Sequence, residues 1–195
     1  MKVAVVKYNA GNVQSVIYAL QRLGVNPLHT EDHEEIATAD KVIFPGQGEA
    51  SSAMAYLKER GLDQVLTSLK QPFLGICIGL QLMCRHSEEG DTDCLGIFDL
   101  DVKRFQIHQD GFKVPHMGWN RLETKDSKLF AGLTDPFLYY VHSYYAELGA
   151  ETTGVTDYIL SFSGALQKEN YYAVQAHPEK SSDAGQAILT NFLAL

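Results

Sequence analysis

Residues 72–83 read PFLGICIGLQLM, and this stretch predicts a strand that turns sharply into a helix. The apolar run PFLGIC ends at Cys77, and apolar residues then recur at helical spacing. Gly75 and Gly79 lie two residues to either side of Cys77. A nucleophile on such a turn needs small neighbours, because its backbone is strained and its side chain must stand clear of the sheet. The stretch therefore predicts a cysteine nucleophile elbow, in which the start of the following helix favours the thiolate.

The residues before this elbow alternate short β-branched runs with helical patterns, which is typical of a parallel sheet covered by helices. We expect strands at residues 2–8, 25–29, 41–44 and 72–77. We expect helices at residues 13–24, 50–60 and 62–70, and an acidic helical turn at residues 31–35. Gly24 is placed to end the first of these helices as its C-terminal cap.

After about Asp93 the pattern changes to short, alternating and aromatic strands, which is typical of a mixed or antiparallel extension of the sheet. These strands are expected at residues 98–105, 114–123, 137–148, 156–160, 163–169 and 171–179. Asp183 is expected to open a closing helix. Because no repeat, low-complexity tract or linker interrupts the chain, we predict an α/β fold in a single domain over residues 1–195.

The composition fits a globular chain and argues against several classes of function. Of the 195 residues, 45% are hydrophobic and 21% are charged, and the formal net charge is −8. Since Lys and Arg form no cluster, we expect no nucleic-acid partner. Met1 leads directly into a predicted strand and no apolar window approaches membrane-spanning length. We therefore expect a cytoplasmic protein with no membrane partner.

The number and spacing of the three cysteines argue against structural roles for them. Cys77, Cys84 and Cys94 are odd in number and lack Cys-x-x-Cys spacing. They therefore predict neither a disulfide framework nor a structural zinc site. Cys84 is expected to behave as a small buried apolar residue, so Cys77 is the residue with chemistry to explain.

A nucleophilic cysteine needs a base within hydrogen-bond reach, and that base needs a third group that fixes its tautomer. The segment QAHPEKS at residues 175–181 offers both groups. His177 follows an alternating strand, and Glu179 could fold back to the imidazole through the turn at Pro178. An H-P-E tripeptide alone is a weak signal, but its combination with GICIG is specific.

The order of motifs in the chain, a PG-rich loop, then G-x-C-x-G-x-Q, then H-P-E, resembles the class I, triad-type glutamine amidotransferases over nearly the full length. The resemblance implies a flavodoxin-like fold with a central, mostly parallel sheet, and it implies no metal and no cofactor. It also implies that Cys77 is the nucleophile, that His177 is the general base and acid, and that Glu179 orients His177.

An oxyanion formed during attack on an amide must be met by preorganised donors. The backbone N–H of Ile78 is one candidate by the elbow geometry, and we assign the N–H of Gln47 in PGQG as the second. Gly46 and Gly48 would let this backbone approach a ligand or reorient, although an ordinary glycine turn after a strand is the alternative. We expect a partner to reorient the Gln47 peptide, so that the isolated chain is nearly inactive.

Substrate contacts are suggested by Gln81, one turn into the elbow helix, and by the segment VHSYY at residues 141–145. In the family that the chain resembles, the corresponding positions hold the α-amino and carboxylate groups of glutamine. The resemblance therefore assigns Gln81, His142, Ser143 and Tyr144 to the glutamine site. His142 could equally be a satisfied histidine of the sheet.

Three flanking segments resemble the glutaminase subunits of imidazole glycerol phosphate synthase: VPHMGWN at residues 114–120, VHSYY at 141–145 and QAHPEKS at 175–181. The resemblance implies a heterodimer with a TIM-barrel cyclase subunit, which uses the channelled ammonia in histidine biosynthesis. It places Asn12, Trp119 and Lys180 near the partner. The chain departs from the pattern in the loop KYNAGN and at Ala176, where an aromatic residue is common.

Three alternatives stay open on the sequence. The chain could serve another synthase, such as that of pyridoxal phosphate or anthranilate, which VPHMGWN disfavours. It could be a stand-alone cysteine amidase or peptidase, although Gln81 and the H-S-Y strand suit a free amino acid better than an extended peptide. It could also be a binding module without catalysis, although the three triad residues are all present.

Overall fold

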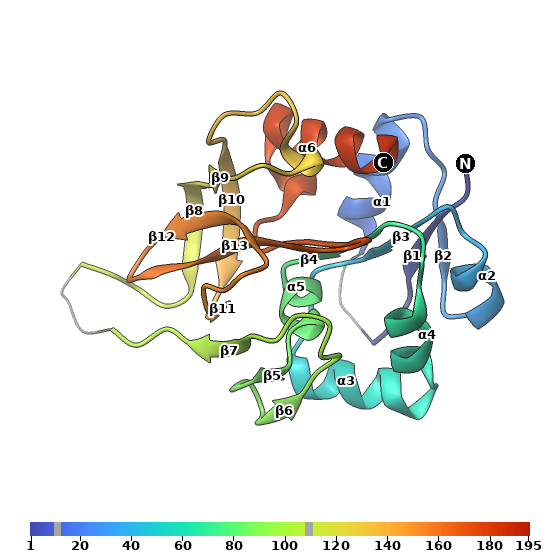
Figure 1. The fold of residues 1–195 in the computed structure, drawn as a ribbon, viewed down its shortest axis with the longest axis horizontal. Coiled ribbons are helices and arrows are strands. Elements are labelled where there is room, and N and C mark those ends of the chain that lie inside the picture. Colours follow the sequence, from blue (N-terminus) through green and yellow to red (C-terminus); the bar gives the residue numbers. More distant parts are fainter. Residues whose placement is uncertain (10–12, 108–110) are drawn as a thin grey trace.

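The computed structural model describes residues 1–9, 13–107 and 111–195. The strands of its main sheet are β1 (Val3–Val6), β2 (Leu28–Thr30), β3 (Lys41–Phe44), β4 (Phe73–Ile76), β9 (Glu123–Thr124), β12 (Thr152–Asp157), β13 (Ser161–Lys168) and β14 (Tyr171–Val174). Within the described residues they lie in the order β2-β1-β3-β4-β14-β13-β12-β9 (Figure 1). The strands from β2 to β14 are parallel, whereas β13, β12 and β9 run antiparallel. The predicted flavodoxin-like α/β sheet with an antiparallel extension is confirmed.

Helices cover both faces of this sheet. They are α1 (Gln14–Arg22), α2 (His33–Ala37), α3 (Ala50–Glu59), α4 (Leu62–Ser68), α5 (Ile78–Met83) and α6 (Ser182–Ala194), with 3-10 turns η1 (Lys128–Phe130) and η2 (Pro178–Lys180). Helices α1 and α6 lie on one face and α3, α4 and α5 on the other (Figure 1). Alternate residues of β1 serve the two faces, since Val5 belongs to the core with Leu20 and Phe192, and Val6 to the core with Leu57.

Two small sheets complete the second half of the chain. One pairs β8 (His116–Arg121) with β10 (Phe137–His142), and the other joins β5 (His86–Ser87), β6 (Thr92–Asp93), β7 (Asp101–Arg104) and β11 (Tyr144–Ala146). The single strand expected at 137–148 is therefore wrong, because β10 and β11 belong to different sheets. The change occurs at Ser143, whose carbonyl accepts a hydrogen bond of 3.0 Å from the Phe105 N–H.

The strand expected at residues 156–160 is also misplaced, because the chain reverses there. Strand β12 ends at Asp157, which pairs with Ser161 at the start of β13. The intervening residues form the hairpin turn, in which the Tyr158 N–H donates to Leu160 O at 3.1 Å. The β-branched residues at 152–156 supply the strand instead.

The topology brings three loops to one edge of the main sheet. Strands β3, β4 and β14 are neighbouring parallel strands, so their carboxyl ends lie together. These ends lead into Pro45, Cys77 and Gln175, respectively. Ligands of open parallel sheets bind at this edge, outside the carboxyl ends of the strands. The predicted site segments therefore converge where an α/β protein places its chemistry.

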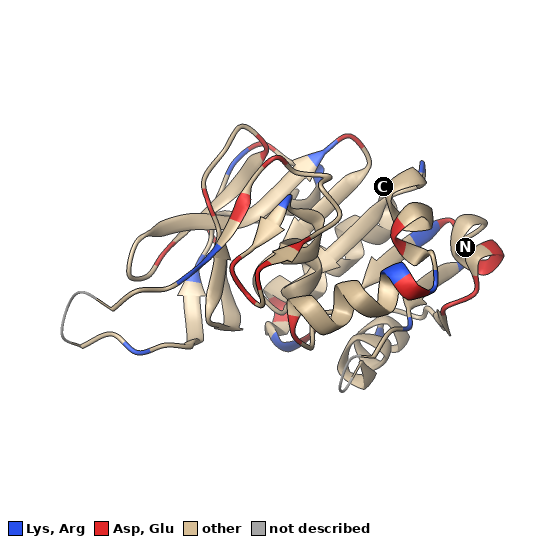
Figure 2. Cartoon of the chain, turned by 90° about the horizontal axis from the view of Figure 1, so that it is seen from below, with Lys and Arg blue, Asp and Glu red and all other residues tan. Residues whose placement is uncertain are grey.

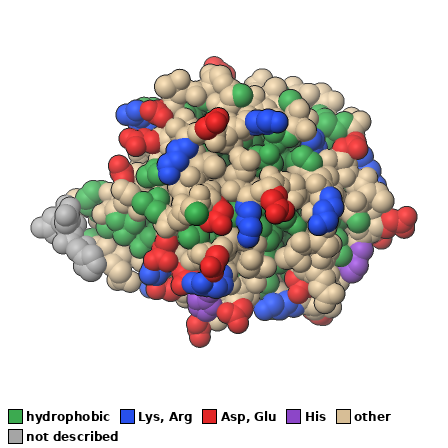
Figure 3. Space-filling view, in the orientation of Figure 1, with side chains coloured by type: hydrophobic (Ala, Val, Ile, Leu, Met, Phe, Trp, Pro, Cys, Tyr) green, Lys and Arg blue, Asp and Glu red, His purple; other side chains and the backbone are tan. Residues whose placement is uncertain are grey.

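The surface carries charges of both signs. Figure 2 shows acidic and basic residues interspersed over the helices and the small sheets. Hydrophobic side chains gather on the face shown in Figure 3 toward the end of the molecule that holds β7, β12 and β13 in Figure 1. Across residues 1–9, 13–107 and 111–195, none of the helices combines the length and apolar character that crossing a membrane requires.

Candidate active site

The Cys77 turn has the strained geometry that the sequence predicts. Cys77 lies between β4 and α5 with φ 50° and ψ −103°, in a region that non-glycine residues rarely adopt. A Cβ added at Gly75 would lie 2.5 Å from Met83 Sδ and 2.8 Å from the Gly79 carbonyl carbon. The strand and the helix therefore pack too closely for a side chain at Gly75. This crowding fixes the direction in which Cys77 leaves the sheet.

His177 reaches Cys77 because their strands are neighbours. The Cys77 N–H donates to Val174 O at 2.8 Å, at the end of β14. His177 follows that strand, and its own N–H donates to Tyr139 O at 2.8 Å. The imidazole lines the same cavity as Cys77 and is close enough for the sulfur to raise its pKa. Residues that are far apart in the sequence are thus brought into contact at the sheet edge.

Glu179 holds the opposite side of the imidazole. His177 Nδ1 lies 2.7 Å from Glu179 Oε1, and each side chain is 2% exposed. Glu179 Oε2 is buried and has no hydrogen-bond partner within the described part of the chain. A buried carboxylate needs charge compensation, and the imidazole is placed to give it.

The electrostatics of this group favour an imidazolium. Burial lowers the pKa of His177, but the interactions with the Cys77 sulfur and with Glu179 together raise it to about 10. His177 is therefore protonated at neutral pH. A thiolate paired with an imidazolium is the activated state of a cysteine nucleophile, and the imidazolium can donate its proton to a leaving group.

A cavity of about 420 Å³ opens beside Cys77. Its lining includes the residues predicted for the nucleophile, the base, the oxyanion loop, the glutamine contacts and the partner rim: Gly46, Gln47, Gly48, Cys77, Ile78, Gln81, His142, Ser143, Tyr144, His177 and Lys180. Glu89, Pro115 and Val141 complete the lining. Trp119 lies outside the cavity and is 54% exposed on β8. Asn12 falls outside the described residues.

Two of the residues predicted to contact substrate are already engaged by the protein. Gln81 Nε2 donates to Tyr144 O and to Gln175 Oε1, each at 3.0 Å. His142 Nδ1 lies 2.7 Å from Tyr144 O, and its Nε2 lies 3.0 Å from His116 Nδ1. Burial lowers the pKa of His142 to about 3. His142 thus has the contacts of a satisfied sheet histidine, the alternative that the sequence left open.

In the oxyanion loop, the Gln47 N–H predicted to stabilise the oxyanion is bonded to another group. The Gln47 N–H donates to Tyr8 Oη at 3.2 Å, so this donor is occupied. Gly46 packs against the nucleophile, because an added Cβ would lie 2.4 Å from Ile76 O and 2.7 Å from Cys77 Cβ. Ile78 lines the cavity as the first residue of α5. The loop therefore touches the nucleophile turn, but its second donor points to another group.

Comparisons with known proteins agree with this geometry. Residues 4–195 match the family model of the class-I glutamine amidotransferases. The chain belongs to this family. "Imidazole glycerol phosphate synthase subunit HisH" of Bacteroides fragilis (strain YCH46) is 59% identical over 100% of both chains. The protein of the same name from Idiomarina loihiensis is 40% identical over 100% of this chain and 98% of its own.

Solved structures titled as glutamine amidotransferases share the fold. A structure titled as a glutamine amidotransferase gives a TM-score of 0.75 at 19% identity, and covers 100% of this chain and 98% of its own. A second, from Thermotoga maritima, gives 0.65 at 15% identity, with 100% and 83% covered. At these identities the likeness concerns the fold alone. The resemblance read from the elbow, H-P-E and VPHMGWN motifs is confirmed by the curated relatives.

The structure adds Gln175 to the site of this amidotransferase. Its side chain is fully buried, and Nε2 lies 3.5 Å from Cys77 Sγ. Since its Oε1 accepts from Gln81, the amide joins the elbow helix to the sulfur. Sequence reasoning missed this residue. A polar residue at a buried strand end, two positions before His177, was the available signal.

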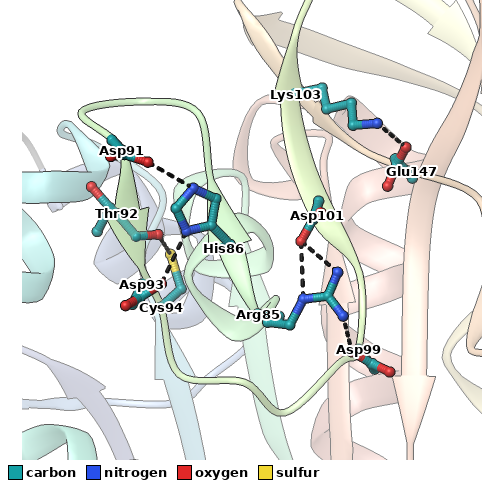
Figure 4. Close-up of polar contacts among 10 residues, drawn as sticks. All are labelled: Arg85, His86, Asp91, Thr92, Asp93, Cys94, Asp99, Asp101, Lys103 and Glu147. Carbon is teal, nitrogen blue, oxygen red and sulfur yellow. Dashed lines mark hydrogen bonds and ion pairs between the residues drawn. The ribbon is translucent and has the colours of Figure 1, made fainter.

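Glu89 is a second residue that the sequence analysis missed. It lies on the hairpin between β5 and β6, and its Oε2 accepts from the Ala50 N–H at 2.8 Å. Burial raises its pKa. At the base of the hairpin, His86 lies between Asp91 and Asp93, at 3.2 Å and 3.0 Å (Figure 4). No local sequence pattern indicates that this acidic loop would fold over the cavity.

The remaining cysteines are poorly placed for chemistry in this amidotransferase. Cys84 is fully buried, as predicted, and burial raises its pKa. Cys94 is half-buried, and burial raises its pKa to about 12. All three cysteines are free thiols. Among the residues placed by the structure, no group of three or more His, Cys, Asp or Glu side chains could hold a metal ion.

Proposed function

We propose that this chain hydrolyses the side-chain amide of glutamine and is the glutaminase subunit of imidazole glycerol phosphate synthase. The observation that carries the proposal is that Cys77 and His177 line one cavity of about 420 Å³, with His177 Nδ1 held 2.7 Å from Glu179 Oε1. The curated relatives that match over their full length bear the name of this synthase subunit. Thiol, imidazole and carboxylate in this order form a nucleophile, a base and an orienting group.

In the first step, the Cys77 thiolate attacks the carbonyl carbon of the side-chain amide. His177 donates its proton to the amide nitrogen as the C–N bond breaks, and ammonia leaves. The product is a glutamyl thioester on Cys77. In the second step, His177 takes a proton from water, the hydroxide attacks the thioester, and glutamate and the thiolate are released. Glu179 steadies the imidazolium in both steps.

The oxyanion of each tetrahedral intermediate needs two donors. The Ile78 N–H at the start of α5 is one proposed donor, and the Gln47 N–H is the other. Because the Gln47 N–H bonds to Tyr8, the second donor must be released before it can contribute. One such donor contributes on the order of 100-fold or more in kcat in comparable enzymes. This supports the expectation that the isolated chain is nearly inactive.

The cavity provides groups for the backbone end of glutamine. Glu89 brings a carboxylate to the cavity, which suits an α-ammonium group. Ser143 and Tyr144 also line the cavity, at the junction of β10 and β11, and are proposed to meet the α-carboxylate. Gln81 is proposed to hold the pocket's shape, because both of its amide hydrogens are committed to protein acceptors.

A partner surface is proposed on strands β8 and β10. Met117, Trp119 and Phe137 are 63%, 54% and 61% exposed on neighbouring strands. Pro115 and Val141 continue these strands to the cavity rim. Exposed apolar patches of this kind mark protein interfaces. We place the TIM-barrel cyclase subunit here, in a heterodimer. The contacts of Lys180 and Asn12 with it stay predictions.

The decisive experiment measures glutaminase activity with and without the cyclase subunit and its nucleotide ligand. We expect strong stimulation by the complex and little turnover by the chain alone. Cys77→Ala should abolish glutamine use, by at least about 1000-fold, and leave ammonia-driven cyclase activity intact. Loss of both activities would argue against ammonia transfer between the subunits. Full turnover by the isolated chain would contradict the release of Gln47 by a partner.

The alternatives are tested by the same preparation. Stimulation by a different synthase would support another acceptor for the ammonia, and peptide cleavage without a partner would support a stand-alone peptidase. A cytoplasmic location belongs to the proposal, because all three cysteines are free thiols, as is usual in a reducing compartment.

A further inference from the structure

Tyr8 lies where the loop after β1 meets the oxyanion loop at residues 45–48. Its hydroxyl is in contact with three backbone groups of that loop: Pro45 O at 2.9 Å, Gln47 O, and the Gln47 N–H at 3.2 Å. No other side chain of the described residues makes a hydrogen bond to these three groups. The hydroxyl therefore joins the two loops at the centre of the Gln47 peptide.

The position of the Tyr8 ring is itself well fixed. The side chain is 7% exposed, and its ring stacks on Phe44 with centroids 4.5 Å apart. Phe44 is the last residue of β3, directly before the oxyanion loop. The neighbouring Asn9 Nδ2 donates to Ser52 O at 3.2 Å, on the far side of that loop. Tyr8 thus has little freedom to follow the Gln47 peptide if the peptide turns.

The hydrogen-bonding capacity of the hydroxyl explains its effect on Gln47. A neutral phenol has one hydrogen to donate and also accepts. Burial raises the pKa of Tyr8, so the phenol is neutral at physiological pH. Its hydrogen serves one of the two carbonyls, and its oxygen accepts the Gln47 N–H. One N–H cannot be aimed at the Tyr8 oxygen and at a substrate oxyanion together.

We infer that Tyr8 is a positioning residue, whose hydroxyl holds the Gln47 peptide in the resting orientation and competes with the oxyanion for its N–H. This inference rests on the proposed function, because it takes Gln47 to be an oxyanion donor. Tyr8 makes no contact with the reacting atoms in this role. It acts through the loop. The Gln47 N–H must leave the Tyr8 hydroxyl before it can stabilise the oxyanion that forms when the thiolate attacks.

Tyr8→Phe tests the inference, because it removes the hydroxyl and keeps the stacked ring. The matched control is Tyr171→Phe, since Tyr171 is also 7% exposed and its hydroxyl bonds to Thr67 O at 2.8 Å, far from the site. Full-length chains are assayed for glutamate release without a partner. We expect Tyr8→Phe to raise kcat about fivefold, the effect of one neutral hydrogen bond, with KM unchanged. Tyr171→Phe should leave both constants unchanged.

An equal or lower kcat for Tyr8→Phe, with a thermal transition like that of Tyr171→Phe, overturns the inference. A measurement on the wild-type chain needs no variant: amide hydrogen exchange of Gln47 should be slow in the free protein. Fast exchange at Gln47 also overturns the inference, even if Tyr8→Phe fails to fold.

Failure of the proposed function gives a different result. The wild-type chain is first treated with 6-diazo-5-oxo-norleucine, a glutamine-like electrophile. Absence of labelling at Cys77, with and without the cyclase subunit, rejects the glutaminase itself. Labelling at Cys77 without activation by Tyr8→Phe rejects the role of Tyr8 alone.

Discussion

The nucleophile turn at residues 75–79 and the Gln47–Gly48 part of the oxyanion loop line the same cavity but are held by different forces. The turn is fixed by steric contact, since a Cβ at Gly75 would lie 2.8 Å from the backbone of Gly79. The loop is held by hydrogen bonds to the Tyr8 hydroxyl. Steric overlap costs rise steeply with displacement, whereas a hydrogen bond of net value about 1 kcal/mol can be exchanged for another. The chain can therefore build its nucleophile rigidly and leave the oxyanion hole adjustable.

The largest effect is expected when the charge of Glu179 is removed, because this carboxylate supports the histidine that serves the nucleophile turn. Glu179→Gln removes the carboxylate that contacts His177 Nδ1 and allows the amide to select the wrong tautomer. We expect kcat to fall by about 1000-fold to 10000-fold, as in other triads. Asp183→Asn, a charge change at the start of α6, is the control and should keep activity. A fully active Glu179→Gln chain would contradict the role of Glu179 in orienting His177.

The same variant should change how stability depends on pH. The raised pKa of His177 gives stability that is fully present below the ordinary histidine value of 6.5 and is lost as pH rises toward 10. Glu179 contributes to that shift, so in Glu179→Gln the loss should still begin near pH 6.5 but should be smaller and end at a lower pH. Urea unfolding of both chains between pH 6 and pH 10 measures the difference.

Steric fixation of the turn is tested by Gly75→Ala. The added methyl would lie 2.5 Å from Met83 Sδ and 2.8 Å from the Gly79 carbonyl, so the elbow helix must move. Displacement of a nucleophile by about 1 Å typically costs about 100-fold in rate. Gly24→Ala is the control, because Gly24 has open space around it and a positive φ of 78°. It should lose stability by about 1–2 kcal/mol and keep its kcat.

Two buried histidines near the cavity, His116 and His142, should make the stability of the chain sensitive to acid. Burial lowers the pKa of His116 to about 4 and that of His142 to about 3, so both are neutral in the folded chain. The unfolded chain binds their protons below about pH 6.5. Stability is therefore full above that pH and falls toward pH 4, by up to about 1.4 kcal/mol per pH unit for each histidine. Urea unfolding at pH 7.5, 6 and 5 measures the slope.

His116→Phe separates the two histidines. Phenylalanine can keep the stack on Tyr140 and Tyr158, at 5.0 Å and 4.0 Å between centroids, and it cannot bind a proton. The acid slope should fall to about half. An unchanged slope would show that the acid sensitivity arises elsewhere in the chain.

The smallest effect is expected at the hairpin that carries Glu89. Asn in place of His86 removes the imidazole held between Asp91 and Asp93 (Figure 4). Asp101 also faces His86 from β7, and Lys58 donates to Asp93 O from α3. Because these pairs are exposed, we expect KM for glutamine to rise about twofold with kcat unchanged.

The hairpin prediction has its own pH signature and control. The carboxylates raise the pKa of His86, so the imidazole contacts are charged at low pH and weaken as pH rises through that value. The KM of the wild-type chain should then approach that of His86→Asn at high pH. Arg85→Gln breaks the neighbouring pairs with Asp99 and Asp101 but leaves the hairpin contacts in place. Equal KM changes in both variants would reject a specific role for His86.

The nucleophile turn was more predictable from the sequence than the contacts of the oxyanion loop. A strand, small neighbours and a cysteine are local signals, and they correctly predicted the strained turn at Cys77. His177 was indicated by the H-P-E motif and by the family resemblance, and the structure brings it to the site through the parallel pairing of β4 with β14. The hydroxyl of Tyr8 depends on how two loops meet, and no local pattern in KYNAGN encodes that contact. The same holds for Glu89, which reaches the cavity through a small sheet.

The fold was predicted well where helices and strands alternate and less well in the antiparallel extension. In the first half, Gly24 ends α1 at positive φ as expected. In the second half, Ser143 lies inside a continuous aromatic run, and the hydrophobic pattern does not mark where the chain changes sheets. Turn position near Asp157 was missed for the same reason, because β-branched and aromatic residues continue through it.

The different surroundings of the three thiols have a practical consequence, since only Cys77 lines the catalytic cavity. Cys84 is sealed in the core and Cys94 holds its proton far above neutrality, at a pKa of about 12. A mild alkylating reagent at pH 7 therefore has a single fast target in the native chain. The moles of reagent consumed in that fast phase, divided by the moles of protein, give the fraction of protein molecules whose site is correctly assembled. Every rate measured for this enzyme can be divided by that fraction to give the rate per assembled site.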